Sequence, residues 1–212
     1  MPAQLNKAAF QFWLCVILIV LASNSAQAMM VLLEENFNND NNGQPDINFN
    51  AFSQFIAIDG TVDLIGQGLA DFYPGNGLYV DLDGTSSNAA QFESSASFNL
   101  LNGQRYRLTF DLANPTQAFG GGSLNNTMTV SLGSGFSEVF NRTSPADFSR
   151  VSREFTVTEN HNVRLVFAHE GGDNLGLLID NISLTAVPVP GLVWLTGLAA
   201  LGIIHPRRRH LR

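Results

Sequence analysis

The segment Tyr106-Arg107-Leu108-Thr109-Phe110-Asp111-Leu112 alternates strictly between larger apolar and polar side chains. Successive side chains of a β-strand point to opposite faces, so this pattern predicts a strand with one buried and one solvated face. The segment Leu78–Asp83 alternates in the same way. Together they indicate a sheet whose one side packs against a core.

Similar segments recur through the middle of the chain, separated by clusters of Gly, Asn, Asp, Ser and Pro. The further candidate strands are Phe52–Ile58, Thr61–Ile65, Phe92–Leu100, Met128–Leu132, Arg153–Val157, Val163–Phe167 and Leu177–Leu184. About ten short strands with one apolar face each are typical of two antiparallel sheets packed face to face. We therefore expect an all-β fold, an antiparallel β-sandwich, over residues 29–186.

Composition and charge exclude several classes of protein. All 18 acidic residues lie between Glu34 and Asp180, together with only six arginines and no lysine, a formal charge of −12. Such a field repels phosphate backbones, so no nucleic acid is expected as a partner. The single cysteine, Cys15, excludes a disulfide framework and a cysteine-based zinc site.

Residues 1–28 have the pattern of a secretory signal peptide. Lys7 precedes the apolar stretch Ala8–Ala22, and Ala26-Gln27-Ala28 is a small-x-small cleavage site. We expect export through the Sec translocon and removal by signal peptidase after Ala28. The alternative is a buried helix or an uncleaved anchor, but the apolar stretch is short for a membrane span.

Residues 187–212 form a second terminal segment. Val187-Pro188-Val189-Pro190-Gly191 is followed by the apolar run Leu192–Ile204, which contains Trp194, and then by Arg207, Arg208 and Arg209. The prolines end the preceding strand. A helix over the apolar run is about 20 Å long, against a hydrocarbon core of about 30 Å. The sequence predicts a short transmembrane helix whose arginine-rich end stays in the cytoplasm.

This order of a Val187-Pro188-x-Pro190 motif, a short helix with Trp194, and arginines resembles the PEP-CTERM sorting signal, although Val189 stands where the commonest form has Glu. The resemblance implies recognition and removal of the tail by an exosortase-type membrane protease. The precursor would be held transiently in the inner membrane. The product would lie at the cell surface or in the matrix of a Gram-negative bacterium, where many such families are tied to exopolysaccharide and biofilm. An ordinary membrane anchor is the alternative.

The central block also resembles known families. The segments Asp59–Gly66, Gly77–Thr85, Asn102–Ala113 and Gly176–Leu184 follow one another in an order similar to the choice-of-anchor C surface domains. More distantly, they resemble galactose-binding-like jelly rolls of carbohydrate-binding modules. The resemblance implies a non-catalytic jelly roll in which a structural calcium joins the first strand to the last.

Asp180 is the candidate calcium ligand in the last strand. It has the same parity as Leu178, Ile182 and Leu184, and is therefore expected to face the core, where a carboxylate is costly unless it is paired or bound to a cation. The family pattern places its partners near the first strand, where Glu35 and Asn38 lie, so the candidate ligand set is Glu35, Asn38 and Asp180. The alternative is an aspartate bonded to main-chain amides.

Two other groups of acids are interpreted as surface features. The run Asn38-x-Asp40-x-Asn42-Gly43 resembles the start of a calcium loop, but its twelfth position is Phe49 rather than an acid, which favours a polar surface loop. Asp81 and Asp83 are expected to point to solvent at a turn.

Catalytic motifs are missing from the central block. His169-Glu170-Gly171-Gly172-Asp173 is expected to form a solvated turn, and no nucleophile elbow, phosphate loop or dinucleotide fingerprint occurs. A glycosidase pair among the scattered acids is the least favoured alternative. We therefore expect no enzyme activity.

Sugar binding has weak support in the sequence, because the only tryptophans, Trp13 and Trp194, lie in the terminal segments. The Gly-rich loop Asn114–Asn126 and Tyr73, in Phe72-Tyr73-Pro74, are the candidate platforms, with a flexible hairpin loop and a packed aromatic as their alternatives. The main functional hypothesis is an exported, exosortase-sorted surface or matrix protein with a non-catalytic β-sandwich. The alternative is a calcium-dependent carbohydrate-binding module, and a secreted glycoside hydrolase is the third.

Overall fold

The computed structural model describes residues 29–86, 88–117 and 122–188. The predicted signal peptide (1–28) lies outside the described residues, as does the sorting segment apart from Val187 and Pro188. Among the residues described, no helix is long and apolar enough to cross a membrane.

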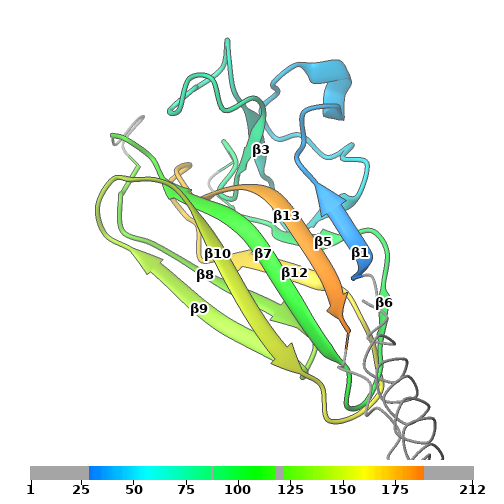
Figure 1. Cartoon of the computed structure of the whole chain (residues 1–212). Helices are drawn as coiled ribbons and strands as arrows, with labels where there is room; N and C mark the ends of the chain where they lie inside the picture. The colour runs from blue at the N-terminus through cyan, green and yellow to red at the C-terminus, as the bar shows by residue number, and fades with distance from the viewer. Residues whose placement is uncertain (1–28, 87, 118–121, 189–212) are drawn as a thin grey trace, which may run out of the picture.

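The first sheet has the strand order β10-β7-β13-β4-β3, and β1 pairs with the free side of β13 (Figure 1). Its strands are β1 (Met30–Glu35), β3 (Asp63–Ile65), β4 (Tyr79–Asp81), β7 (Arg105–Asn114), β10 (Ala146–Thr156) and β13 (Leu178–Val187). The second sheet has the order β2-β5-β12-β8-β9. Its strands are β2 (Phe55–Ile58), β5 (Gln91–Ser94), β8 (Asn126–Leu132), β9 (Phe136–Arg142) and β12 (Leu165–His169).

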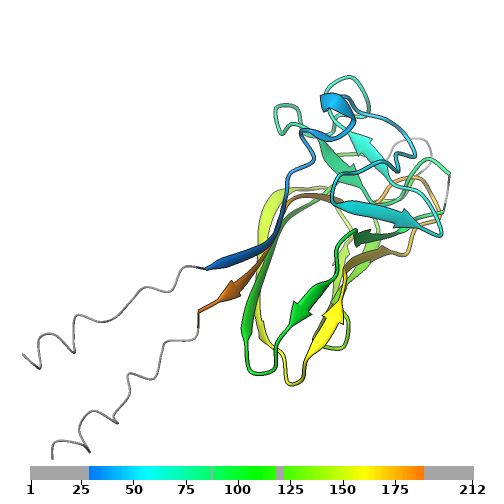
Figure 2. The ribbon, with the colours of Figure 1, turned by 90° about the vertical axis from the view of Figure 1, so that its right-hand side faces the viewer.

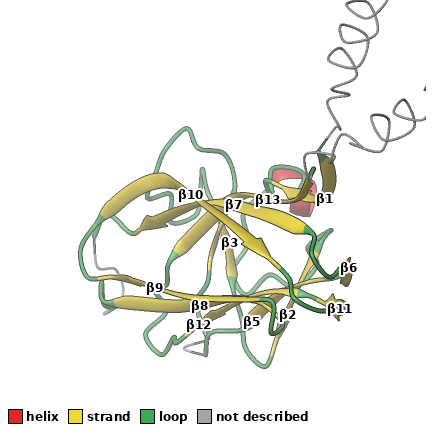
Figure 3. Cartoon of the chain, turned by 60° about the horizontal axis from the view of Figure 1, so that its bottom comes forward, coloured by secondary structure: helices red, strands yellow, loops and turns green. Residues whose placement is uncertain are grey.

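A short pair of β6 (Phe98–Leu100) and β11 (His161–Val163) and a 3-10 turn, η1 (Asp40–Gly43), complete the fold. All strand pairs in both sheets are antiparallel. The two sheets lie face to face (Figure 3). The expected all-β sandwich is confirmed.

The core lies between the sheets and contains the apolar side chains that the alternation predicts. Leu108, Phe110 and Leu112 of β7 are fully buried, and Val130 and Phe167 oppose them from the second sheet. Because each of these strands buries every second side chain, the period of two in the sequence identifies the core face directly.

One candidate strand is divided in two, and β1, β9 and β11 were not among the candidates. The candidate Phe92–Leu100 is two strands, β5 and β6, separated at residues 95–97. Strand β9 was not predicted. It lies at a sheet edge, where only Phe140 is buried, so its sequence shows little apolar alternation.

A β-bulge in β13 reverses the predicted orientation of Asp180. The register with β7 shifts between Asp180 and Ser183, and Asn181 has a left-handed backbone with φ of 48°. Ile182 and Leu184 therefore face the core, whereas Asp180 pairs with Asp111 on the outer face of the first sheet. The prediction that Asp180 faces the sandwich core is wrong, because one extra residue in a strand exchanges its two faces.

The outer face at this end of the sheet is nevertheless buried. Ile65, Tyr79, Ala113 and Leu178 form a second apolar cluster, on which Phe72, Tyr73 and Phe148 pack. The segment between β3 and β4, which contains Phe72 and Tyr73, thus covers the upper part of the sheet and buries Asp180 with it.

The two ends of the domain lie side by side. Met30 at the start of β1 is paired with Ala186 near the end of β13, as Figure 2 shows. Val187 is still part of β13, where it pairs with Arg105 and accepts a hydrogen bond from Gln104 Nε2 at its main-chain oxygen. The folded domain therefore extends one residue beyond the expected boundary at 186.

Candidate functional site

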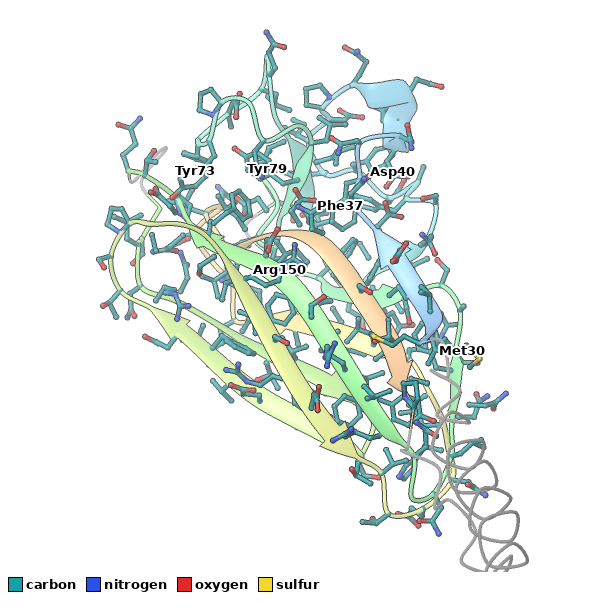
Figure 4. All side chains as sticks on the ribbon, viewed as in Figure 1. Met30, Phe37, Asp40, Tyr73, Tyr79 and Arg150 are labelled. Atoms are coloured by element: carbon teal, nitrogen blue, oxygen red, sulfur yellow. The ribbon has the colours of Figure 1, made fainter. Side chains whose placement is uncertain are left out.

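A groove lies where the upper ends of β1 and β13 meet the loops that follow β1. It has a volume of about 530 Å³ and is lined by Glu34, Glu35, Asn36, Asn39, Ser53, Gln54, Arg150, Asn181, Ile182 and Ser183. All of these side chains except Ile182 are polar. Arg150 belongs to β10, and Asp40 is the first residue of η1, above β1 (Figure 4). We call this feature the β1–β13 groove.

Glu35, the last residue of β1, is hydrogen-bonded to the loop above that strand. Its Oε1 accepts hydrogen bonds from the main-chain N–H groups of Asn36 and Phe37, both at 2.8 Å. Its Oε2 accepts from Ser53 Oγ at 3.0 Å and from Gln54 Nε2 at 3.2 Å. The carboxylate therefore fixes both the exit of β1 and the start of the following loop segment.

Asp40 contributes a buried oxygen next to this carboxylate. It is 5% exposed, and its Oδ1 accepts a hydrogen bond from the main-chain N–H of Ser53 at 2.9 Å. Its Oδ2 is buried and has no hydrogen-bond partner. Burial raises the pKa of the Asp40 carboxyl, hydrogen bonds from Ser53 lower it, and the charge of Glu35 raises it. The surrounding loop is exposed at Asn38, Asn42 and Gly43 as predicted, but Asp40 is not.

Asp180 lies beneath the loop that covers the sheet and is 1% exposed. Its Oδ1 accepts from the main-chain N–H of Asn181 at 2.7 Å. Its Oδ2 accepts from Asn181 Nδ2 at 3.1 Å and from Asn76 Nδ2 at 3.4 Å. One of these donors is a main-chain amide, as the alternative expected, and the other two are side-chain carboxamides.

Burial raises the pKa of Asp180 to about 7. The Asn181 main-chain N–H lowers this pKa, whereas the negative charges of Asp111 and Glu35 raise it, and Arg150 lowers it. Glu35, predicted as a joint ligand, therefore lies close enough for its charge to raise the pKa of Asp180.

Asn38, the third predicted ligand, lies elsewhere. Its Oδ1 accepts a hydrogen bond from the main-chain N–H of Leu78 at 2.8 Å, and it lines a different pocket together with Asp71 and Gly77. A Cβ on Gly77 would collide with that oxygen, so only glycine leaves room for the contact. Of the three predicted ligands, Glu35 and Asp180 are connected only by the effect of the Glu35 charge on the Asp180 pKa, and Asn38 lines a different pocket.

Among the described residues, no group of three or more His, Cys, Asp or Glu side chains could hold a metal ion. Within the groove region, the unpartnered Oδ2 of Asp40 is the one observation that points to a missing positive group. Calcium prefers oxygen ligands of this kind. Glu35, Asp40 and Asp180 are the buried or half-buried acids of this region, and they do not form such a group of three.

Tyr73 occupies the position of a packed aromatic. Its hydroxyl lies 2.6 Å from the main-chain oxygen of Asn114 and 2.7 Å from that of Ala146. Its ring packs edge-on against Phe148, with the centroids 5.3 Å apart. These contacts correspond to the structural alternative for Tyr73 rather than to a free platform for sugars.

Three residues expected at the solvent are buried instead. Asp81 is 4%, Asp83 0% and His169 9% exposed. The segment that follows β12 folds over them, and Gly176 donates its N–H to Asp81 Oδ1 at 2.7 Å. Sequence alternation alone cannot show this burial, because a loop distant in the chain covers the outer face.

No protein-family model matches the chain, and no curated protein matches it. Several solved structures have a similar fold. A xylan-binding domain, CBM22-1, from Paenibacillus barcinonensis is 12% identical, with 78% of this chain and 99% of that domain covered and a TM-score of 0.44.

The CBM22-1-GH10 modules of a Clostridium thermocellum xylanase, complexed with xylohexaose, are 11% identical with a TM-score of 0.46. That alignment covers 76% of this chain and 29% of the xylanase chain, so the present chain spans less than a third of it. The K3 cleaved adhesin domain of Lys-gingipain from Porphyromonas gingivalis is 14% identical, with 74% and 99% covered and a TM-score of 0.46.

Proposed function

We propose that the protein is a non-catalytic, exported β-sandwich that binds a neutral glycan in the β1–β13 groove. The observation that supports this most is the chemistry of the lining. Carboxamides of Asn36, Asn39, Gln54 and Asn181 and hydroxyls of Ser53 and Ser183 supply donors and acceptors at one surface. Sugar hydroxyls need such mixed partners.

The size and charge of the groove narrow the ligand class. Its volume of about 530 Å³ is within the usual range for small-ligand sites. Arg150 already forms a salt bridge with Asp111, so Glu34 and Glu35 leave the lining net negative. An acidic polysaccharide would be repelled. A neutral one, bound without an aromatic among the described lining residues, would have a dissociation constant on the order of 1 mM.

Calcium is the proposed cofactor of this end of the domain, at Glu35 and Asp180 with Asp40 in the place predicted for Asn38. The unpartnered Asp40 oxygen and the raised pKa values of Asp40 and Asp180 support it. Bound calcium would supply positive charge to these buried or half-buried carboxylates. Glycan retention that is lost in EDTA and restored by calcium would support this assignment, whereas retention unchanged in EDTA would remove it.

Export and sorting complete the proposal. Residues 1–28 would be removed by signal peptidase, and an exosortase-type protease would act on the tail. Met30 is paired with Ala186, so the tail leaves the domain at the end where β1 begins. The groove lies at the other end of β1, and a domain held by its tail would therefore keep the groove away from the point of attachment. Deleting 188–212, which leaves Val187 in its strand, should release the protein from the membrane fraction of the producing cell. Retention there would contradict the sorting role.

The glycan proposal is tested by retention of the full chain, in mild detergent, on immobilised xylan, mannan and alginate. We expect retention on a neutral polysaccharide and none on alginate. Gln54→Ala should weaken retention about fivefold, since Gln54 lines the groove. The matched control is Gln91→Ala, an exposed glutamine on the second sheet. Equal retention of both variants, or none for the wild type, would overturn the proposal.

A further inference from the structure

Three aspartates are buried together at β3 and the end of β4. Asp63, Asp81 and Asp83 are 7%, 4% and 0% exposed, and Asp63 is paired directly with Asp81 across the two strands. None of them lines the β1–β13 groove. We call this group the Asp83 cluster. Like charges directly opposite each other in a sheet are destabilising, so the arrangement needs a compensating interaction.

The hydrogen bonds of the cluster leave one oxygen without a partner. Both oxygens of Asp63 are bonded, Oδ1 to the main-chain N–H of Asn48 at 2.7 Å and Oδ2 to the Thr85 hydroxyl at 2.6 Å, whereas Asp81 and Asp83 accept from main-chain N–H groups. Asp81 Oδ1 accepts from the N–H groups of Asp83 at 3.0 Å and Gly176 at 2.7 Å. Asp83 Oδ2 accepts from those of Asp173 at 3.1 Å and Asn174 at 3.2 Å. Asp83 Oδ1 is buried and has no partner at all. A buried carboxylate oxygen without a partner lowers the stability of the fold by more than an ordinary hydrogen bond raises it.

The part of the chain that the structure describes offers these carboxylates no positive side chain as a partner. Within the described ranges, no salt bridge joins an arginine to Asp63, Asp81 or Asp83, and the central block has no lysine. His169 lies close enough for its pKa to respond to Asp83, but burial lowers that pKa and so disfavours the charged ring. Both of its ring nitrogens face main-chain N–H groups, those of Gly171 and Leu177.

We propose that Asp81 and Asp83 bind a calcium ion at a site separate from Glu35 and Asp180. A buried carboxylate that has no partner is stable only when it is neutralised or bound to a cation. Two carboxylates, with main-chain carbonyls and water, can provide the six to eight oxygens that calcium takes. Asp63 adds negative charge beside them. The ion would fasten the end of β4 to the segment 170–176, which already reaches Asp83 through two N–H groups.

The test uses the full chain in mild detergent, stripped with EDTA, and the variant Asp180→Asn to remove the other proposed site. Equilibrium dialysis with radioactive calcium should give one bound ion per Asp180→Asn chain. The melting temperature of that variant should rise by roughly 5 °C in 1 mM calcium. Adding Asp83→Asn should abolish both the binding and the rise. Asp147→Asn, an exposed acid, is the matched control and should keep both.

Three outcomes would overturn the proposal. The first is an Asp180→Asn chain that binds no calcium. The second is binding that persists in Asp180→Asn/Asp83→Asn. The third is a cluster stabilised by a proton alone. In that case the melting temperature in EDTA would rise as the pH falls, and calcium would not change it at pH 7. Should Asp83→Asn fail to fold, Asp81→Asn takes its place, and the ion count for Asp180→Asn still decides. Glycan retention is not among the readouts, so failure here leaves the proposed function standing.

Discussion

The outer face of the first sheet differs between its two halves, although β7, β10 and β13 run through both. In the lower half, Arg107 and Glu154 lie on the surface and pair with each other. In the upper half, Leu178, Asp180 and Tyr79 are buried beneath the segment that connects β3 to β4. Strand alternation determines which way a side chain points, but only the covering loops determine whether it meets water.

The largest expected effect concerns the residue that fixes a covering loop to the core. Phe37 is fully buried in the left-handed region, with φ of 59°, and its ring contacts those of Phe52, Phe55 and Phe92. Phe37→Ala should lower the free energy of unfolding by about 3–5 kcal/mol, measured by urea denaturation. Val139→Ala, at a side chain 63% exposed, should change it by less than about 0.5 kcal/mol. Similar losses in the two variants would show that the upper loops are not anchored in the core.

The next effect is a pH dependence that only the covered half should show. The folded pKa of Asp180, about 7, lies above the unfolded value near 3.9, so the folded state binds the proton more tightly. Its contribution is therefore fully present below about pH 4 and is lost as the pH rises through 7. In calcium-free buffer, Asp180→Asn should be more stable than the wild type at pH 8, by about 2–4 kcal/mol, and equal to it near pH 4.

Urea midpoints of both proteins at several pH values measure this difference. The exposed carboxylate of Asp147 supplies the control, since Asp147→Asn should follow the wild type at every pH. A parallel pH profile for Asp180→Asn and the wild type would mean that Asp180 is solvated.

A smaller effect is expected at Tyr73. Tyr73→Phe removes the hydroxyl that joins the covering segment to the main chain at Asn114 and Ala146. The loss should be about 1 kcal/mol in urea denaturation, with glycan retention unchanged. Reduced retention at unchanged stability would instead restore Tyr73 as a binding platform.

The smallest effect belongs to the exposed half. Arg107 Nε donates to Glu154 Oε1 at 2.9 Å, and this interaction lowers the pKa of the Glu154 carboxyl. Both side chains are more than a third exposed, and exposed ion pairs contribute little. Arg107→Ala should leave the urea midpoint within error of the wild type at low and high salt. A clear destabilisation would show that this half is also covered.

The difference between the two halves explains which features could be predicted from the sequence. The alternation in Tyr106–Leu112 correctly predicts the sandwich and its core, because those strands are regular. The position of Asp180 could not be predicted, because the bulge at Asn181 changes the parity without a glycine to mark it. The burial of Asp81, Asp83 and Asp40 depends on loops that are distant in the chain. The groove was missed for the same reason, since its residues come from β1, β10, β13 and a loop.

The central claim, that the β1–β13 groove binds a neutral glycan, is tested most directly by amide chemical-shift mapping. The ¹⁵N-labelled full chain in detergent micelles would be titrated with xylohexaose and mannohexaose in calcium. The account predicts dose-dependent shifts at Asn36, Gln54, Asn181 and Ser183, and none at Arg107 or Glu154. Shifts confined to other surfaces, or no shifts with either sugar, would contradict it.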